Sequence, residues 1–308
     1  MKPVRTKLLA ALLAAALTVP AGAVAATGDL RPTAGTSWQA DSTFGIEWDP
    51  IAPPDPTEAV YRIYDSQGRH VLISRRPIAQ MLKDIAVPAI PDAYTLKAWL
   101  QNSDGERGPQ STTILRFDNA APSAPVLDSP PEWILGTEPA VVGVAEASPP
   151  LPLSGISGHA LSVGGESGSS PCAQGERCHA AEIDIAGPEG GTISLGTLPE
   201  GIHPVRAVAV SGTGVPSQVT TAVVRVDGSA PAVSLANAPV GWSNRPVLLT
   251  AHATDPLSGM AAAGPPGPFT ALAVDGGAPA RALGEAVGAW VGSSGLHAIE
   301  YFARDAAG

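Results

Sequence analysis

A short motif occurs twice in the chain, in nearly the same form and far apart. The segment RFDNAAPSAP begins at Arg116 and RVDGSAPAVS begins at Arg225, 109 residues later. Trp133 and Trp242 recur at the same distance. Motifs that repeat in a fixed order are the signature of tandem structural units. We therefore expect a chain of similar modules, with each copy of the motif at a boundary between two of them.

Other motifs recur in the same order, at distances that drift. PLSG begins at Pro152 and again at Pro256, and strand-like segments end in SGTG at Gly214 and in DAAG at Gly308. Loop insertions and deletions between shared strands produce such drifting offsets. The second copy continues beyond Gly214 with VPSQVTTAVVRVD, whereas the third copy reaches only Gly308. We therefore expect the last module to lack its final strand and the sequence to be a fragment of a longer protein.

These repeats predict how the chain divides. We expect a signal peptide at residues 1–25 and domains at residues 26–118, 119–229 and 230–308, the last of them truncated. Each internal boundary carries an apolar residue and Asp, followed by small residues and then Pro. Proline stiffens a linker and stops a strand from continuing into the next sheet.

The segments between the turns have the alternation of β-strands. In YTLKAWLQN, apolar Tyr94, Leu96 and Ala98 alternate with polar residues, the period-two pattern of a half-buried strand. The 34 Gly and 32 Pro among 308 residues supply turns between many short strands. Only PIAQMLKDI, from Pro77, is expected to form a turn or two of helix. The pattern therefore predicts an all-β fold of tandem two-layer sandwiches.

From Asp227 to Gly308 the motifs VDGSAPAVS, GWSNRPV, ATDPLSG, VDGG and GLHAIEYFARDAAG follow one another. In this order they resemble the bacterial Ig-like repeats of secreted and surface proteins. Residues 119–229 resemble the same repeat more weakly, and the first domain is similar to a fibronectin type III domain through IEWDP, YRIYD and YTLKAWLQNSDGERGP. The resemblance implies tandem immunoglobulin-like or fibronectin III-like β-sandwiches with about seven strands each. It brings no catalytic residues with it.

The N-terminus has the organisation of a secretory signal peptide. MKPVRTK is basic, LLAALLAAALTV is apolar, and AVA ending at Ala25 predicts cleavage between Ala25 and Ala26. The competing interpretation is an uncleaved anchor, for which the apolar run is short. No later segment approaches the length of a membrane span. We therefore expect a protein that is secreted, extracellular or on the cell surface of a bacterium.

The charge of the chain argues against nucleic-acid binding. The net charge is −10, and loss of Lys2, Arg5 and Lys7 with the signal peptide makes it −13. Such a surface repels phosphate backbones, and no basic cluster offsets it. We expect an extracellular protein or glycan as the partner.

Two cysteines, Cys172 and Cys178, lie close together in SSPCAQGERCHA. In an exported protein a close pair is expected to form a disulfide, which here would close a short loop. The alternative is a metal site that uses both thiolates and His179, but zinc needs a fourth ligand.

Asp118 and Asp227, in the two boundary motifs, are candidate calcium ligands. Calcium requires several oxygen ligands, and Asp255, just before the second PLSG, is the one further candidate that the sequence offers. The competing interpretation is that these aspartates have only a structural role. We otherwise expect no cofactor.

No catalytic constellation stands out. GISGHALS lacks the second glycine of a nucleophile elbow and its strand–turn–helix context. His203 and His297 share a position in the repeat, which favours packing or hydrogen bonding over metal binding. Trp38 is expected to be the most exposed tryptophan and a candidate for stacking on a ligand such as a sugar. We expect a non-catalytic spacer, adhesion or presentation array; the alternative is the substrate- or carbohydrate-binding accessory region of a larger exported hydrolase.

Overall fold

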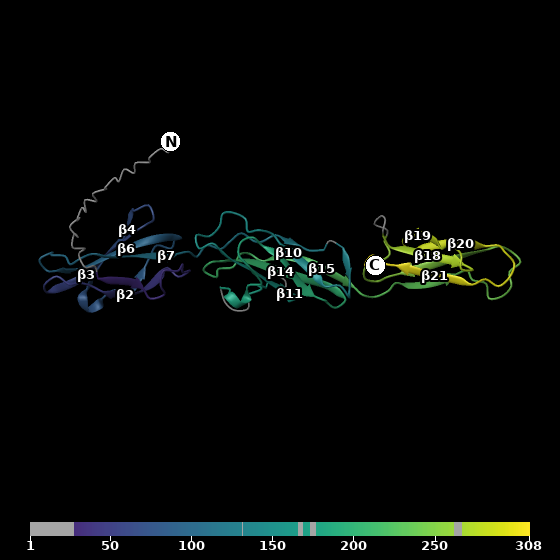
Figure 1. Ribbon diagram of the computed structural model, residues 1–308, viewed down its shortest axis with the longest axis horizontal. Helices are drawn as coiled ribbons and strands as arrows, with labels where there is room; N and C mark the ends of the chain where they lie inside the picture. Colours follow the sequence, from purple (N-terminus) through teal and green to yellow (C-terminus); the bar gives the residue numbers. More distant parts are fainter. Residues whose placement is uncertain (1–27, 131, 166–168, 173–176, 262–266) are drawn as a thin grey trace, which may run out of the picture. The chain divides into compact units, whose positions relative to one another are not determined.

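The computed structural model describes residues 28–130, 132–165, 169–172, 177–261 and 267–308 (Figure 1). In these residues the fold is all β, which confirms the predicted class. The helical structure among them is two single 3-10 turns, Ile78–Gln80 and Ala180–Glu182. The first lies in the segment for which a turn of helix was expected. The predicted signal peptide and its cleavage site at Ala25 and Ala26 lie outside the described residues.

The described chain forms two compact units, the first with its main parts in Thr43–Ala86 and Tyr94–Leu115, the second with most of its residues from Arg116 onward. The first sandwich consists of two sheets, in the orders β1-β2-β5 and β4-β3-β6-β7. Its strands are β1 (Asp29–Pro32), β2 (Thr43–Asp49), β3 (Pro56–Tyr64), β4 (His70–Pro77), β5 (Asp84–Ala86), β6 (Asp92–Asn102) and β7 (Ser111–Phe117).

Tyr94, Leu96 and Ala98 of β6 are buried, as their alternation predicts. With Phe44 of β2 they belong to the apolar core of this sandwich. The period-two pattern of the sequence therefore identifies the buried face of its central strand.

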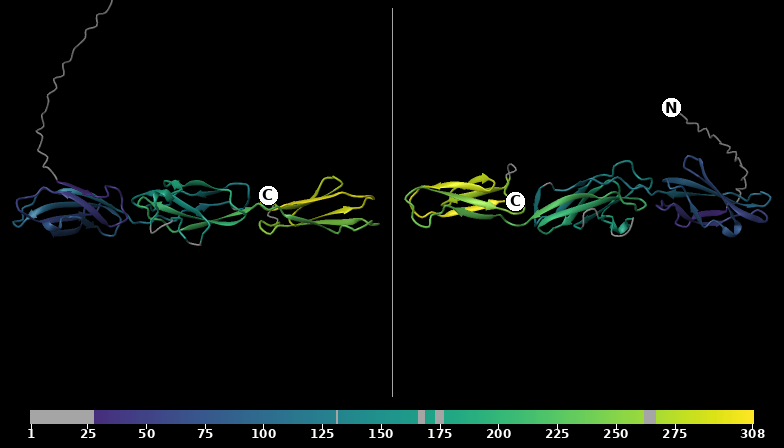
Figure 2. Two further views of the ribbon diagram at one scale, coloured as in Figure 1. Left: turned by 90° about the horizontal axis from the view of Figure 1, so that it is seen from below. Right: turned by 180° about the vertical axis from the view of Figure 1, so that it is seen from behind.

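The second unit contains the middle sandwich, drawn in teal and green in Figure 2. Its two sheets have the orders β13-β10-β8 and β12-β11-β14-β15-β9. Its strands are β8 (Leu127–Asp128), β9 (Trp133–Leu135), β10 (Ala140–Val144), β11 (Ile156–Val163), β12 (Ile185–Ala186), β13 (Gly191–Gly196), β14 (Gly201–Ser211) and β15 (Thr220–Asp227). Ala140, Val142, Val205, Val224 and Val226, from both sheets, form its core.

The last sandwich has the sheet orders β16-β17-β20 and β19-β18-β21. Its strands are β16 (Ala232–Ala236), β17 (Val247–Thr254), β18 (Phe269–Val274), β19 (Ala280–Leu283), β20 (Ala286–Val291) and β21 (Ile299–Arg304). Leu249, Ala251, Leu272 and Val287 form its buried core. β21 occupies the place in the repeat that β14 has in the middle sandwich.

Candidate metal centre at the repeated aspartate

Asp118, the aspartate of the first boundary motif, binds two backbone N–H groups. Its Oδ1 accepts a hydrogen bond from the N–H of Ala120 at 3.0 Å, and its Oδ2 accepts one from the N–H of Ser154 at 2.6 Å. Ser154 is the serine of the first PLSG motif. Asp118 is fully buried, so these bonds replace the water that its carboxylate loses.

Asp227, the aspartate of the second boundary motif, repeats this arrangement. Its Oδ1 accepts a hydrogen bond from the N–H of Ser229 and its Oδ2 one from the N–H of Ser258, both at 3.0 Å. Ser258 is the serine of the second PLSG motif. The two motifs therefore recur together because each aspartate binds the loop that carries the following PLSG.

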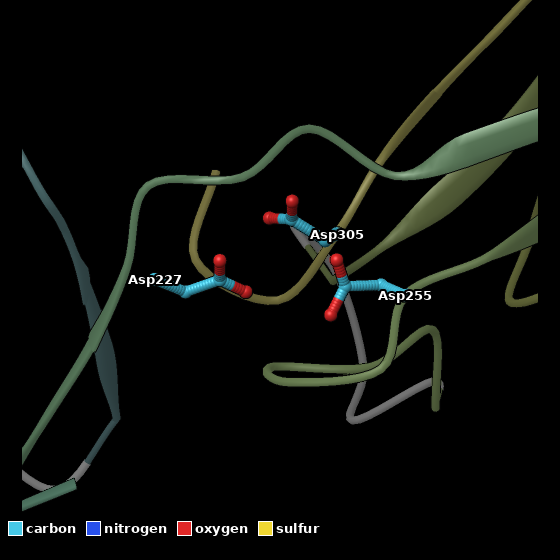
Figure 3. A group of neighbouring side chains, drawn as sticks. All are labelled: Asp227, Asp255 and Asp305. Atoms are coloured by element: carbon cyan, nitrogen blue, oxygen red, sulfur yellow. The ribbon is translucent and has the colours of Figure 1, made fainter. Parts of the chain in front are cut away.

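Two further aspartates face Asp227 in the last sandwich. One carboxylate oxygen each of Asp227, Asp255 and Asp305 lies within 4.8 Å of the others (Figure 3). Asp227 is 1% exposed and Asp305 5% exposed. Like charges this close repel strongly unless a cation or proton lies between them. We call these three residues the aspartate cluster.

Asp305 is held in place by the turn that follows β21. Its Oδ1 accepts hydrogen bonds from the N–H groups of Ala307 at 2.9 Å and Gly308 at 2.8 Å. Asp305 was not among the ligands predicted from the sequence. Its place in the repeat could have identified it, because Asp305 is the first residue of DAAG, the counterpart of SGTG in the preceding repeat.

Asp255 carries the least satisfied oxygen of the cluster. Its Oδ1 accepts hydrogen bonds from the N–H groups of Leu257 and Gly259, both at 2.9 Å. Its Oδ2 is shielded from solvent and has no hydrogen-bond partner among the residues that the structure describes. A buried carboxylate oxygen without a donor is costly, and a bound cation is one way to compensate it.

The first boundary lacks this cluster. Leu151 and Ser211 occupy the places in the repeat that Asp255 and Asp305 have in the next copy. The Ser211 hydroxyl accepts hydrogen bonds from the N–H groups of Thr213 and Val215. It therefore stabilises this turn as Asp305 does in the next copy, but without a charge. Of the three predicted calcium ligands, the structure therefore brings together Asp227 and Asp255, and not Asp118.

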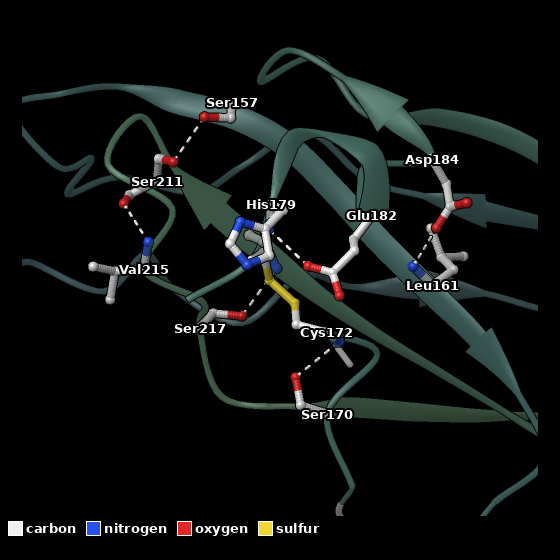
Figure 4. The surroundings of a disulfide bond; sticks show 12 residues. Ser157, Leu161, Ser170, Cys172, His179, Glu182, Asp184, Ser211, Val215 and Ser217 are labelled. Atoms are coloured by element: carbon white, nitrogen blue, oxygen red, sulfur yellow. Dashed lines mark hydrogen bonds between the residues drawn. A yellow bond between two sulfur atoms is a disulfide. The ribbon is translucent and has the colours of Figure 1, made fainter. Parts of the chain in front are cut away.

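Cys172 and Cys178 form a disulfide, with their Cα atoms 5.1 Å apart (Figure 4). Both are buried against Ala160 of β11 and Val208 and Val210 of β14. Because the two sulfur atoms are bonded to each other, they are not thiolate ligands, and the alternative metal site with His179 does not form.

The two equivalent histidines make the same hydrogen bond, as expected from their shared position. Nε2 of His203 lies 2.6 Å from the carbonyl oxygen of Pro199, and Nε2 of His297 lies 3.0 Å from that of Ser293. His297 also binds Asp275 at 2.7 Å. This second hydrogen bond raises the pKa of His297 above its ordinary value and lowers the pKa of Asp275.

His159 in β11 is a buried histidine in a different setting. Its side chain is fully buried, and neither ring nitrogen has a hydrogen-bond partner among the described residues. Burial lowers the pKa of His159 below its usual value, because the charged form is poorly solvated there. A neutral, unpartnered ring fits a packing role.

The expectation that Trp38 is exposed is wrong. Trp38 is half-buried, whereas Trp242 is 83% exposed and Trp290 is 69% exposed. Both belong to the last sandwich.

No family model and no curated protein matches the chain. Among solved structures, the fibronectin(III)-like modules of Clostridium thermocellum CbhA are 17% identical, with a TM-score of 0.34, over 64% of this chain and 95% of that one. A mutant of Salmonella alpha-2-macroglobulin is 13% identical, with a TM-score of 0.27, over 90% of this chain. This chain spans 20% of the macroglobulin. No helix in the described residues has the length and apolarity of a membrane span.

Proposed function

We propose that the protein is a non-catalytic, exported array of β-sandwich modules of the bacterial Ig-like kind, which spaces or presents a partner at the cell exterior. We further propose that calcium binds at the aspartate cluster and stiffens the start of the last module. Both proposals rest on the boundary aspartates. Asp118 and Asp227 each bind the PLSG loop that follows them in the sequence. Near Asp227 lie two further carboxylates, those of Asp255 and Asp305.

The repeated hydrogen bonds support a spacer. Asp227 ends β15 of the middle sandwich and binds the N–H of Ser258, a residue of the loop that follows β17. Hydrogen bonds to a charged, buried acceptor are among the stronger ones, at about 1.5–3 kcal/mol each. An array that must hold a partner at a distance needs such fixed connections between successive sandwiches.

The chemistry of the aspartate cluster supports calcium. Calcium takes six to eight oxygen ligands and accepts irregular geometry. Backbone N–H groups hold Oδ1 of Asp255 and of Asp305. The cluster thus supplies three preorganised carboxylates, and backbone oxygens or water would complete the shell. With so few charged ligands, we expect an affinity in the range of extracellular modules, about 10⁻⁴–10⁻³ M.

Calorimetry tests the calcium site directly. Calcium added to the full chain should bind with heat and should raise the melting temperature of the last sandwich, and a chelator should reverse the rise. Asp255→Asn should abolish both effects. Glu285→Gln, which removes an exposed acid of the same sandwich outside the cluster, should leave both unchanged. Unchanged melting at millimolar calcium would overturn the calcium proposal.

Small-angle X-ray scattering tests the spacer. A fixed, extended array should give a distribution of interatomic distances with a long tail, and calcium should raise the radius of gyration. A compact distribution, with the modules collapsed on one another, would contradict a spacing role whatever the calcium result.

An accessory carbohydrate-binding role is the second candidate. It is favoured by Trp290 of β20, which is exposed beside its cross-strand neighbour Leu248, because exposed tryptophan faces stack on sugar rings. Binding on a glycan array that Trp290→Ala abolishes would support this role. Silence across a broad array would remove it.

A further inference from the structure

The four-stranded sheet of the first sandwich carries three cations on the face that points away from the core. Arg62 of β3 lies directly opposite Lys97 of β6. Leu96 and Ala98 are buried in the core, so Lys97 between them points outward, and Arg62 with it. Arg107, in the segment after β6, faces Gln101 of β6 in a β-bridge on the same side. We call Arg62, Lys97 and Arg107 the basic face.

None of these three cations forms an ion pair with an acid within the residues that the structure describes. Glu58 of β3 lies on the same face, but it is paired with Arg75 at 3.0 Å. Like charges on directly opposite residues destabilise a strand pair, and Arg62 and Lys97 are such a pair. The Nε of Arg62 is also shielded from solvent and has no hydrogen-bond partner among the described residues. A bound anion would relieve both costs.

Aromatic rings hold the three cations in position. The Cζ atoms of Arg62 and Arg107 lie 5.6 Å and 5.1 Å from the centroid of the Trp99 ring. The Nζ of Lys97 lies 5.0 Å from the centroid of the Tyr64 ring. A guanidinium on a ring keeps the donors along its edge free for an anion, and its ordering is already achieved before the anion binds. The rings therefore preorganise the basic face.

The basic face is a local exception on an acidic protein. Its members come from three separate segments of the sequence, which is why the sequence contains no basic run there. Most Lys and Arg beyond residue 25 lie in residues 26–118, whereas acids far outnumber bases from residue 119 onward. Charges are screened over about 8 Å at physiological salt, so the basic face acts on a partner that touches it.

An exposed apolar side chain continues the row of cations across the sheet. Ile73 of β4 lies opposite Arg62, on the side away from Lys97, and it is 43% exposed. Neighbouring strands lie about 4.7–4.9 Å apart. The row therefore presents one apolar group and then two cations, at the spacing of the strands.

We propose that the basic face binds an acidic polysaccharide, a linear polymer with a carboxylate on each sugar, which lies across the strands. Arginine binds carboxylates through two parallel hydrogen bonds, and Ile73 packs on the apolar C–H face of a sugar ring. An exposed ion pair contributes little alone, so several carboxylates linked in one polymer are needed for measurable affinity. The inference rests on the proposed function and deepens it, because it names the class of partner at the cell exterior.

The position of the cations favours a sugar polymer over an acidic peptide. An extended peptide binds a sheet by adding a strand at its edge. Arg62 and Lys97 lie on β3 and β6, the two inner strands of the order β4-β3-β6-β7. A partner at these residues therefore lies on the face of the sheet, where a peptide backbone finds no ladder to join.

Fluorescein-labelled short fragments of polygalacturonate test the proposal by fluorescence anisotropy. The protein is the exported chain from Ala26, because the basic residues of the predicted signal peptide would bind a polyanion themselves. A chelator is present, so calcium takes no part. We expect saturable binding that weakens at least about tenfold between about 50 and 500 mM salt. The methyl-esterified polymer has the same backbone without charge and should not bind.

Matched variants locate the site. Lys97→Gln and Arg107→Gln each remove one charge and should weaken binding about two- to fivefold, and together about tenfold. Lys97→Arg keeps the charge and should retain binding. Lys83→Gln makes the same change of charge at an exposed residue beside β5, in the other sheet, and should leave binding unchanged. Thermal unfolding of each variant shows that the sandwich stays folded.

Three results would overturn the proposal. The first is no binding of polygalacturonate at low salt. The second is binding that the double variant leaves intact. The third is equally tight binding of polyglutamate or duplex DNA, because the basic face would then bind negative charge without preference for a sugar polymer. The spacing role, which scattering tests, would survive each of these results.

Discussion

Replacing Asp305 by Asn should stabilise the protein without calcium and remove its response to calcium. Asn keeps the Oδ1 that accepts hydrogen bonds from Ala307 and Gly308, so the turn after β21 can persist. Only the negative charge is lost. The substitution thus separates the structural role of this side chain from its electrostatic role.

The expected size of the effect follows from the spacing within the cluster. Two unit charges 4.8 Å apart repel by about 3.5 kcal/mol at an effective dielectric constant of 20. Asp305 takes part in two such pairs, with Asp227 and Asp255. Backbone donors, solvent and salt offset most of this repulsion, so we expect a net gain of about 1–2 kcal/mol in a chelator. For a domain of this size, each kcal/mol raises the melting temperature by about 4–8 °C.

Differential scanning calorimetry measures the melting temperatures of the wild type and the variant, each in chelator and in calcium. In chelator the Asp305→Asn chain should melt higher than the wild type. Calcium at ten times its dissociation constant should stabilise the wild type by about 1.4 kcal/mol and leave the variant unchanged. Glu285→Gln should behave as the wild type in both solutions.

A particular result would refute this reasoning. If Asp305→Asn lowers the melting temperature equally in chelator and in calcium, the carboxylate is a structural cap and the cluster is not strained by repulsion.

Three further predictions concern the middle sandwich and its boundary. The pKa of His159 is lowered in the folded chain, so below about pH 6.5 the unfolded chain binds a proton that the folded chain does not, and the wild type loses stability. His159→Leu should reduce this loss, which urea unfolding at pH 8 and pH 5 measures. Asp118→Asn should cost about 1–3 kcal/mol by urea unfolding, since the amide cannot accept both N–H groups, and an unchanged midpoint would contradict the boundary role. Changing Cys172 and Cys178 to Ser should cost about 2 kcal/mol by thermal unfolding, given the sequence separation of 6.

The fold could be predicted from local patterns because burial in a sandwich follows the period of the strand. Tyr94, Leu96 and Ala98 were placed on one face by alternation alone, and they are buried. The disulfide was predictable because its two cysteines are close in sequence. Each of these inferences depends on residues near one another in the chain.

The candidate site needed contacts that no local pattern contains. Asp227 and Asp255 were identified from motifs, but Asp305 joins them only when the turn after β21 folds back on both. Trp38 was expected to be exposed and is half-buried, for a related reason. The exposure of a tryptophan depends on whether a distant strand lies beside it, as β15 lies beside Trp133.

The position of Asp227 has a consequence for how the protein unfolds. This residue is the last of β15, yet its carboxylate binds a loop of the sandwich that follows. Melting β15 therefore releases a contact of the next sandwich, and loss of that loop exposes a buried charge at the end of β15. Neighbouring sandwiches should unfold cooperatively, as in repeat proteins governed by nearest-neighbour coupling. A cut at residue 229 would leave the third domain without the carboxylate that holds its PLSG loop.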